Sequence, residues 1–299
     1  MYKSGFISII GRANVGKSTL MNQLVGEKIA IMSNKPQTTR NRIQCILTRD
    51  DYQAVFIDTP GIHTPKNKLG NYMVKVAHTT LNEVDIILYL VEPEVKIGKL
   101  DKEIIERLNN VNSKVFLCVN KIDSVPKEQV LEVINLYKDK LEFAEIIPIS
   151  AYDGNNISSL LNCIEKYLPE GPQFFPDDMI TDQPERQLVA ELVREKSLHL
   201  LNQEIPHGIA IEIDTMTKRP DGDIVDIEAT IICERDSHKR IIIGKQGQMI
   251  KSIGTHARRD IERLLGSKIY LTLWVKVKKN WRDSDFMLKN YGYNKRELD

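Results

Sequence analysis

The chain has 299 residues and a formal net charge of +1, with 41% hydrophobic and 28% charged residues. This composition is ordinary for a globular protein, and the length predicts roughly two domains. No apolar stretch approaches membrane-spanning length, and Met1–Phe6 leads into an apolar run without a signal-peptide pattern. We therefore expect a soluble, cytoplasmic protein rather than a membrane-spanning or secreted one.

The cysteines are scattered, without a C-x-x-C pair or a histidine cluster at the spacing of metal ligands. Three of the four lie inside apolar runs, which predicts buried thiols in a reducing compartment. The four cysteines are Cys45, Cys118, Cys163 and Cys233.

The first motif is a glycine-rich phosphate loop at Gly11–Ser18, with the pattern G-x-x-x-x-G-K-S. It directly follows the apolar run Phe6–Ile10, so we expect a strand, a tight turn and then a helix that begins near Ser18. Backbone N–H groups of such a loop point at phosphate oxygens, and the positive end of the helix reinforces them. We predict that Lys17 reaches the β- and γ-phosphates and that Ser18 binds Mg²⁺. The predicted nucleotide contacts in this motif are Gly11, Asn14, Val15, Gly16, Lys17, Ser18 and Thr19.

Three further segments complete a predicted guanine-nucleotide site. Each follows a strand-like apolar run, and open parallel sheets bind ligands at the carboxyl ends of their strands. The segments are Asp58-Thr59-Pro60-Gly61, Asn120-Lys121-Ile122-Asp123 and Ser150-Ala151. Asp123 can accept two hydrogen bonds from guanine, whereas adenine has no donor pair there and would leave the carboxylate unpaired. We expect Asn120 to brace the phosphate loop, Lys121 to lie along the base and the Ala151 N–H to face guanine O6.

A magnesium site and a switch segment are predicted beside the triphosphate. We expect Asp58 to hold Mg²⁺ through water and the Gly61 N–H to meet the γ-phosphate. The polar loop Ser33–Arg42 has no regular period, and a switch loop needs a hydroxyl that reaches Mg²⁺ only while the γ-phosphate is present. Thr38 or Thr39 supplies it, and we favour Thr39. The predicted catalytic residues are Lys17, Thr39 and Gly61. The predicted metal ligands are Ser18, Thr39 and Asp58. A second switch segment is expected from Asp58 to about Asn71.

One residue that Ras-like enzymes use is missing. In those enzymes a glutamine after the glycine of Asp-x-x-Gly orients the attacking water, and here Ile62 stands at that position. Isoleucine can neither donate nor accept a hydrogen bond, so we expect slow intrinsic hydrolysis. Asn14 resembles the asparagine that coordinates K⁺ in cation-activated GTPases, but it equally suits a left-handed turn, and both interpretations stay open.

The chain divides at a segment that holds four prolines, residues 169–184. We assign residues 1–168 to a GTPase domain with a doubly wound, mostly parallel α/β sheet, and 169–184 to a linker. Arg42–Thr48 and Gln53–Ile57 flank two aspartates like the arms of an antiparallel hairpin, so the sheet is expected to be mixed.

The second domain, residues 185–280, has the order helix, two strands, helices around a glycine loop, and a final strand. Gly244-Lys245-Gln246-Gly247 lies between an isoleucine run and an amphipathic helix, and this resembles the G-x-x-G loop of a smaller α+β domain, a type II KH domain. Between Lys239 and Arg282 twelve Lys or Arg residues oppose two acidic residues, which predicts a polyanionic partner. The predicted RNA-binding residues are Ile243, Gly244, Lys245, Gln246, Gly247, Lys251 and Arg258.

Residues 281–299 are predicted to form a basic and aromatic C-terminal tail. Its aromatic side chains either stack on nucleic-acid bases or pack on the protein surface, and we favour packing. They are Trp281, Phe286, Tyr291 and Tyr293.

From end to end, the chain resembles the Era family of bacterial GTPases. The resemblance rests on G-R-x-N-V-G-K-S, P-Q-T-T-R, D-T-P-G-I-H and N-K-x-D in the first domain and on I-I-G-K-x-G in the second. It implies a switch that binds GTP or GDP with Mg²⁺, hydrolyses GTP and binds the 3′ end of 16S rRNA. It also implies a role in 30S ribosomal subunit assembly and a loose, peripheral association with the cytoplasmic membrane.

Two other functions stay open. A GTP-regulated RNA chaperone with negligible hydrolysis would carry the same motifs, and phosphate release measured with and without RNA separates it from a GTPase. A signalling GTPase with a protein effector seldom carries a basic KH domain and usually carries a lipid-anchor cysteine, which the final residues Lys295–Asp299 lack.

Overall fold

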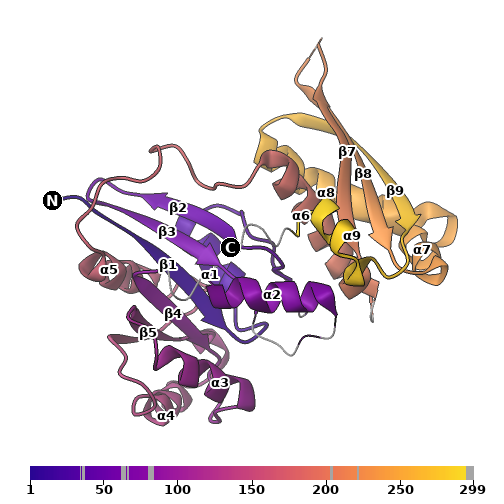
Figure 1. Ribbon diagram of the computed structural model, residues 1–299. Coiled ribbons are helices and arrows are strands. Elements are labelled where there is room, and N and C mark those ends of the chain that lie inside the picture. Colours follow the sequence, from indigo (N-terminus) through magenta and orange to yellow (C-terminus); the bar gives the residue numbers. More distant parts are fainter. Residues whose placement is uncertain are drawn as a thin grey trace.

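The protein folds into two units joined by an extended segment (Figure 1). The computed structural model describes residues 1–33, 35, 38–61, 65, 67–79, 84–202, 205–220 and 222–293. Three features discussed above, Ile62, the pair Pro36-Gln37 and the C-terminal Lys295–Asp299, lie outside the described residues. Within the described residues, no helix combines the length and the apolar character needed to cross a bilayer.

The first unit is built on a six-stranded sheet with the order β2-β3-β1-β4-β5-β6. Its strands are β1 (Lys3–Gly11), β2 (Ile43–Thr48), β3 (Tyr52–Asp58), β4 (Ile86–Val91), β5 (Lys114–Val119) and β6 (Glu145–Pro148). All neighbouring pairs are parallel except β2 and β3, which pair antiparallel. The prediction of a mostly parallel sheet with one hairpin is therefore confirmed.

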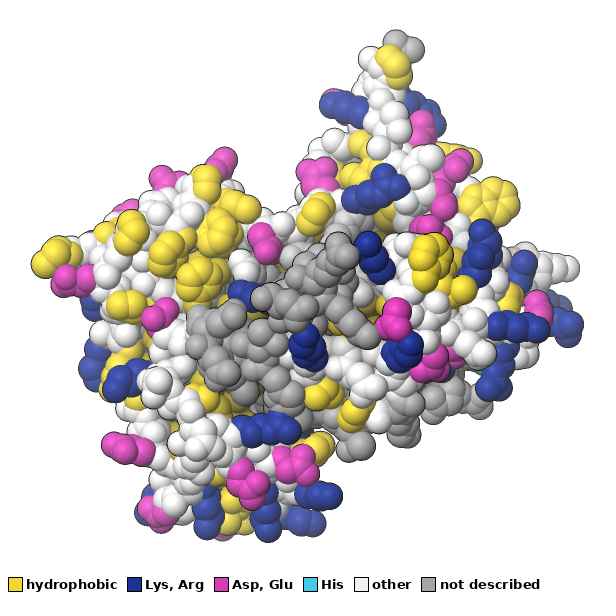
Figure 2. Space-filling view, in the orientation of Figure 1, with side chains coloured by type: hydrophobic (Ala, Val, Ile, Leu, Met, Phe, Trp, Pro, Cys, Tyr) yellow, Lys and Arg dark blue, Asp and Glu magenta, His cyan; other side chains and the backbone are white. Residues whose placement is uncertain are grey.

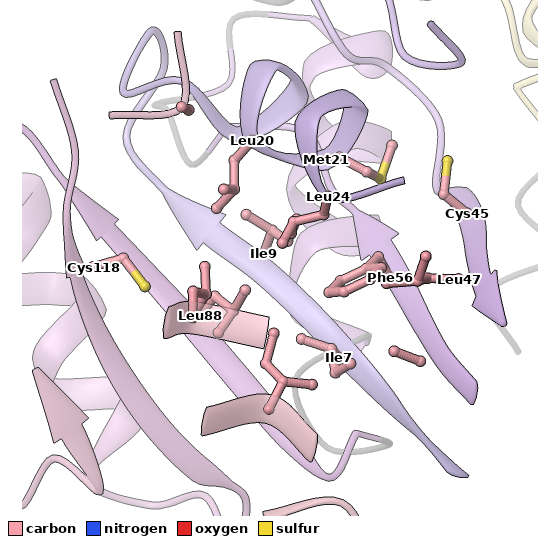
Figure 3. Close-up of a cluster of buried hydrophobic side chains, with 14 of the residues drawn as sticks. Ile7, Ile9, Leu20, Met21, Leu24, Cys45, Leu47, Phe56, Leu88 and Cys118 are labelled. Atoms are coloured by element: carbon pink, nitrogen blue, oxygen red, sulfur yellow. The ribbon is translucent and has the colours of Figure 1, made fainter. Parts of the chain in front are cut away.

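Helices cover both faces of this sheet, which explains why its strands are continuous apolar runs. The helices are α1 (Lys17–Val25), α2 (Lys68–Thr79), α3 (Lys99–Leu108), α4 (Lys127–Tyr137) and α5 (Ile157–Tyr167), with a short 3₁₀ turn, η2, at Ile122–Ser124. Helices α1 and α5 pack on one face and α3 and α4 on the other. Figure 3 shows Leu20, Met21 and Leu24 of α1 lying over Ile7 and Ile9 of β1. This packing anchors the first turn of α1, and with it the phosphate loop, to the sheet.

The second unit has a three-stranded sheet with the order β7-β8-β9. Its elements are α6 (Glu185–Leu200), η3 (Ile205–Gly208), β7 (Ala210–Lys218), β8 (Ile224–Cys233), α7 (Asp236–Ile243), η4 (Lys245–Gly247), α8 (Gln248–Leu265) and β9 (Lys268–Val277). Strands β7 and β8 are antiparallel, β8 and β9 are parallel, and α6, α7 and α8 share one apolar core with the sheet. This is the predicted α+β arrangement of a type II KH domain.

The connection between the units lies along the first sheet. The Ser4 N–H donates to the Pro169 carbonyl at 3.0 Å, and the Ile46 N–H donates to the Ile180 carbonyl at 2.8 Å. The side chain of Gln53 donates to the Phe175 carbonyl at 2.9 Å. Residues 169–184, the predicted linker, are thus hydrogen-bonded to β1, β2 and β3 along part of their length.

The C-terminal segment corrects the expectation of a tail. It forms η5 (Trp281–Asp283) and α9 (Asp285–Asn290), and α2 of the first unit reaches toward it (Figure 1). Trp281 and Tyr293 are buried in a core that includes Tyr72 and Met73 of α2, so neither ring is available to stack on RNA bases. Of the four aromatic residues only Phe286 is largely exposed, at 75%. The base-stacking alternative is therefore wrong for Trp281 and Tyr293, because the other unit covers them.

The prediction of buried thiols is confirmed for three of the four cysteines. All four are free thiols, and Cys45, Cys118 and Cys233 are buried while Cys163 is partly so.

Candidate functional site

The phosphate loop curls tightly between β1 and α1. Gly16 has a φ of 102°, and a Cβ there would lie 2.3 Å from the Asn120 side-chain nitrogen, so this position admits no side chain. That nitrogen donates to the Val15 carbonyl at 2.8 Å. Asn120, which directly follows β5, therefore braces the loop, as predicted. Asn14 has a φ of 68°, so the left-handed turn that was one of its two interpretations is present.

Lys17 is buried at the base of this loop. Its amino group donates to the Arg12 carbonyl at 2.9 Å and to the Gly11 carbonyl at 3.3 Å. Burial lowers the pKa of Lys17, and the nearby Asp58 carboxylate opposes that shift. The ammonium lines a pocket together with Gly61 and Thr19, and it can exchange its carbonyl partners for phosphate oxygens that enter there.

Three oxygen-bearing side chains meet where β3 ends beside α1. Ser18 Oγ donates to Asp58 Oδ2 at 2.8 Å, Thr39 Oγ1 donates to the same oxygen at 3.1 Å, and the two hydroxyl oxygens lie 3.0 Å apart. All three residues predicted as metal ligands are thus within hydrogen-bond distance of one another. We call the group of Ser18, Thr39 and Asp58 the metal corner.

This corner fits Mg²⁺. Asp58 is fully buried, and its other oxygen, Oδ1, has no hydrogen-bond partner among the described residues. Burial raises the pKa of Asp58, and Lys17 and the two hydroxyl donors oppose the rise. A buried carboxylate oxygen without a partner, beside two hydroxyls, matches the hard oxygen ligands that Mg²⁺ prefers, with phosphate and water completing the shell. No cluster of three His, Cys, Asp or Glu side chains that would hold a metal occurs among the described residues.

The geometry separates the two candidate switch threonines. Whereas Thr39 Oγ1 points into the metal corner, Thr38 Oγ1 donates to the Lys35 carbonyl at 2.6 Å, within its own loop. The preference for Thr39 agrees with this arrangement.

The base-recognition segments lie at the ends of β5 and β6. Asp123 is exposed at this edge, and its Oδ1 accepts a hydrogen bond from Ser150 Oγ at 2.6 Å. Lys121 donates to the Asn14 carbonyl at 2.8 Å, which ties this segment to the phosphate loop. The Ala151 N–H donates to Asn120 Oδ1 at 2.9 Å, so the structure places it against protein rather than in the open position expected for guanine O6. That N–H is buried because the Ser150-Ala151 turn packs against Asn120.

Residues 59 and 60 connect this corner to the second switch. Thr59 and Pro60 are both buried, and Thr59 Oγ1 donates to the Ile9 carbonyl at 3.3 Å. They hold Gly61 at the pocket beside Lys17. Every nucleotide-contact residue predicted from the sequence is therefore near one edge of the sheet.

The second unit carries an open groove between α8 and β9. Lys251 and Arg258 line it, as do seven residues that sequence reasoning missed: Ile250, Gly254, Thr255, Ile269, Tyr270, Leu271 and Leu273. Ile250, Gly254 and Arg258 are spaced by four residues and so share one face of α8, a signal that was present in the sequence. A Cβ on Gly254 would sit 3.4 Å from the Leu273 side chain, so α8 and β9 approach closely at this point.

The G-x-x-G loop turns between α7 and α8. Gly244 has a φ of 74°, and a Cβ there would lie 2.9 Å from the Met249 backbone nitrogen, so only glycine fits. Lys245 and Gln246 are exposed, whereas Ile243 and Gly247 are half-buried. Figure 2 shows Lys and Arg side chains gathered at the end of the second unit where Figure 1 places α7. The loop and the groove thus form a basic surface with an apolar floor.

Comparison with known proteins agrees with this two-part architecture. A family profile described as "50S ribosome-binding GTPase" matches residues 6–121, and one described as "KH domain" matches residues 204–282. GTPase Era from Alkaliphilus metalliredigens is 61% identical over 98% of this chain and 99% of that protein. GTPase Era from Clostridium kluyveri is 59% identical over 98% and 100%. The chain belongs to the Era family of GTPases.

Solved Era structures share the whole fold. A crystal structure of Era in complex with MgGDPNP and nucleotides 1506–1542 of 16S ribosomal RNA matches with a TM-score of 0.94 at 41% identity, covering 98% of this chain and 99% of that one. A variant of Aquifex aeolicus Era bound to GDP and aluminium fluoride matches with a TM-score of 0.93 at 42% identity, covering 97% and 99%. As a member of the Era family, this chain is a GTPase built from a P-loop domain and a KH domain.

Proposed function

We propose that this GTPase is a GTP-gated RNA-binding switch that binds the 3′ end of 16S rRNA and acts in assembly of the 30S subunit. The observation that carries the proposal is the basic groove between α8 and β9, which shares one chain with a pocket lined by the phosphate loop and by Thr39 and Gly61. A groove of this kind clamps about four unpaired nucleotides.

The nucleotide site is assigned by the chemistry of its side chains. Lys17 and the N–H groups of the phosphate loop bind the β- and γ-phosphates, and Ser18, Thr39 and Asp58 hold Mg²⁺. When bound, Mg²⁺ neutralises charge that develops on the phosphate oxygens. The γ-phosphate and Mg²⁺ would hold Thr39 and Gly61 at this end of the pocket more tightly than GDP does, so hydrolysis would loosen both switch segments.

The choice of RNA comes from relatives. Era bound to nucleotides 1506–1542 of 16S rRNA is similar to this chain over nearly its full length, KH domain included. The profile named for the 50S subunit matches only residues 6–121, which lack the RNA groove. We therefore favour the small subunit. In this assignment Lys251 and Arg258 neutralise phosphates of the RNA, and the sugar-phosphate backbone of the RNA approaches the G-x-x-G loop at Gly244 and Gly247.

The test is RNA affinity as a function of nucleotide state. Fluorescence anisotropy with a labelled 3′-terminal fragment of 16S rRNA measures binding to the full chain loaded with a non-hydrolysable GTP analogue or with GDP. The coupling is reciprocal. If the GTP-analogue form binds RNA more tightly than the GDP form by some factor, then bound RNA raises the affinity for the GTP analogue, relative to GDP, by the same factor. Equal RNA affinity in both states contradicts the gating, and equal affinity for a scrambled RNA contradicts the 16S assignment.

Three finer assignments stay predictions. Potassium activation rests on Asn14, whose positive φ explains an asparagine there without any cation; equal turnover in K⁺ and Na⁺ buffers would exclude it. The cytoplasmic location rests on the sequence, which has neither a membrane-length apolar stretch nor a signal-peptide pattern, and the peripheral attachment to the membrane rests on the family resemblance alone. Slow intrinsic turnover rests on Ile62.

A further inference from the structure

The residue next to Thr39 is buried inside the other unit. Arg40 belongs to the loop between α1 and β2, yet it is only 1% exposed. Its guanidinium donates to the Ile209 carbonyl at 2.6 Å, to the His207 carbonyl at 3.1 Å and to the Tyr293 hydroxyl at 3.2 Å. All three acceptors belong to the KH domain or to the C-terminal segment packed on it.

An aromatic ring completes the Arg40 pocket. The guanidinium carbon lies 5.9 Å from the centroid of the Trp281 ring, a cation–π distance. Trp281 is itself fixed, because it is fully buried and its indole N–H donates to the Gly208 carbonyl at 2.9 Å. Among the described residues, no carboxylate forms an ion pair with Arg40. Backbone carbonyls, a hydroxyl, an aromatic ring and, at longer range, the Glu191 carboxylate of α6 therefore stabilise the positive charge. All of these groups belong to the KH unit or to the C-terminal segment packed on it.

The residue on the other side of Thr39 is held from the same unit. Arg194 of α6 is also 1% exposed, its Nε donates to Glu191 at 2.8 Å, and its Nη2 donates to the Thr38 carbonyl. Further along the same loop, the Met32 N–H donates to the buried Glu195 carboxylate at 2.9 Å. Between α1 and β2 the described residues form neither helix nor strand, so these contacts order the loop in place of secondary structure.

We infer that the KH domain is a working part of the hydrolytic site, and that Arg40 and Arg194 are positioning residues which hold the Thr39 hydroxyl in the metal corner. The inference rests on the role proposed above for Thr39. Because Thr38 and Arg40 are both anchored to the KH unit, Thr39 Oγ1 can stay 3.1 Å from Asp58 and 3.0 Å from Ser18 only while that unit is docked. Movement of the KH unit would therefore change the rate of hydrolysis through Thr39.

The experiment compares GTP turnover by full-length variants. Arg40→Met removes the three hydrogen bonds while keeping an unbranched, apolar stem, and misplacing a catalytic group by about 1 Å costs up to about 100-fold in rate. At saturating Mg²⁺ we expect kcat to fall about 10- to 100-fold, while the affinity for GDP changes less than about threefold, since the GDP complex does not need Thr39 in place. Arg186→Met is the matched control, because Arg186 also donates to a backbone carbonyl, that of Asp214 at 2.9 Å, but within the KH unit itself.

A double-mutant cycle identifies the route of the effect. If Arg40 acts through Thr39, Arg40→Met lowers kcat by less than about twofold when introduced into Thr39→Ala. A further fall in kcat of more than about twofold in the Thr39→Ala background contradicts the inference. A folded Arg40→Met variant with wild-type kcat contradicts it as well. Where Arg40→Met does not fold, Tyr293→Phe removes one hydroxyl acceptor and keeps the ring, and unchanged kcat in that variant is equally contradictory. Unchanged kcat in Thr39→Ala alone would instead remove the proposed role of Thr39, and this inference with it.

Discussion

Thr38 and Thr39 are identical neighbouring side chains, and their partners give them different roles. Thr39→Ala removes a hydroxyl that bonds to Asp58 and lies beside Ser18, whereas Thr38→Ala removes one that bonds to the Lys35 carbonyl. We expect Thr39→Ala to weaken Mg²⁺ binding in the GTP-analogue complex by about 1–3 kcal/mol, and to leave the GDP complex unchanged. Mg²⁺ titrations of both variants with both nucleotides measure this. A larger effect for Thr38→Ala would reverse the assignment.

Asp123 is the residue that we propose to select the base. Its carboxylate is exposed at the end of β5 and is oriented by Ser150 at 2.6 Å. Asp123→Asn replaces one acceptor oxygen with a donor, which suits xanthine and opposes the exocyclic amine of guanine. We expect the preference to shift from GTP toward XTP by about 10²-fold or more, measured by competition binding. Unchanged GTP preference would show that Asp123 does not contact the base.

At the scale of elements, the glycine loop before α8 can be tested against the glycine after it. Gly247 and Gly266 both have positive φ, 76° and 61°, and a Cβ on either meets nothing within 4 Å. Aspartate tolerates this conformation better than most residues, so Gly247→Asp and Gly266→Asp add the same charge with similar strain at opposite ends of α8. We expect Gly247→Asp to weaken RNA binding about tenfold or more and Gly266→Asp to have little effect.

Binding of GTP is the internal control for this pair. Both variants should bind GTP like the unmodified chain, because α8 carries no residue of the nucleotide site. Equal RNA affinities for the two variants would remove the G-x-x-G loop from the RNA-binding surface.

The regular elements were predictable because their signals are local. Continuous apolar runs marked β1 and β3, expected at Phe6–Ile10 and Gln53–Ile57, within a few residues of their observed bounds, and such runs before Asn120 and Ser150 marked β5 and β6. A strand covered on both faces needs apolar side chains throughout. Strands β7, β8 and β9 instead alternate apolar and polar residues, because successive side chains point to opposite faces and every second one enters the core shared with the helices. The patterns did not single out β4, although all six of its residues are buried, because no nucleotide motif follows it.

At the scale of the whole molecule, one tryptophan joins the two units. Trp281 lies in the core that contains Tyr72 and Met73 of α2 and Ile232 of β8. Trp281→Ala should destabilise the protein by about 3–5 kcal/mol, since it removes a fully buried ring and leaves a cavity. We also expect thermal unfolding to separate into two transitions, because the shared core that couples the units is lost.

Trp274→Ala is the matched control for that change. Trp274 lies on β9 and is 58% exposed, so its removal should cost far less and leave a single transition. Calorimetry of both variants decides; a single transition in Trp281→Ala would show that other contacts suffice to couple the units.

A charge cluster between the units makes their association sensitive to acid. Lys28 of the first unit contacts Glu195 of α6 at 2.7 Å and Asp260 of α8 at 2.8 Å, and Lys196 also contacts Glu195 at 2.7 Å. Burial by itself would raise the pKa of both carboxyl groups, but hydrogen bonds from Lys196 and Lys28 outweigh it and hold both pKa values below 4.5 and 3.8, their ordinary values. A carboxyl group with a lowered pKa in the folded protein contributes stability above its ordinary pKa and loses that stability as the pH falls through the lowered value.

The corresponding prediction concerns the acid limb of the stability profile. Denaturant unfolding followed between about pH 6 and pH 3 should show stability falling with pH in the unmodified chain, and falling less steeply in Glu195→Gln, which has no charge to lose. Because breaking one partner of a buried pair is costly, Glu195→Gln should also be less stable near neutral pH. Parallel acid limbs for the two proteins would contradict this role for Glu195.

The chemistry proposed for each site can be inferred from short stretches of the sequence. The phosphate loop, Asp58, Asp123 and the G-x-x-G loop were singled out because their proposed roles depend on a few neighbouring residues and their backbone. What each of these segments packs against could not be inferred in this way, because it depends on contacts between distant parts of the chain. Arg40 and its acceptor His207 are 167 positions apart, and Arg40 and Tyr293 are 253 positions apart. No local pattern distinguishes a buried arginine in a polar loop from a solvated one, or a buried Trp281 from an exposed Phe286, because burial depends on which distant surface covers the side chain.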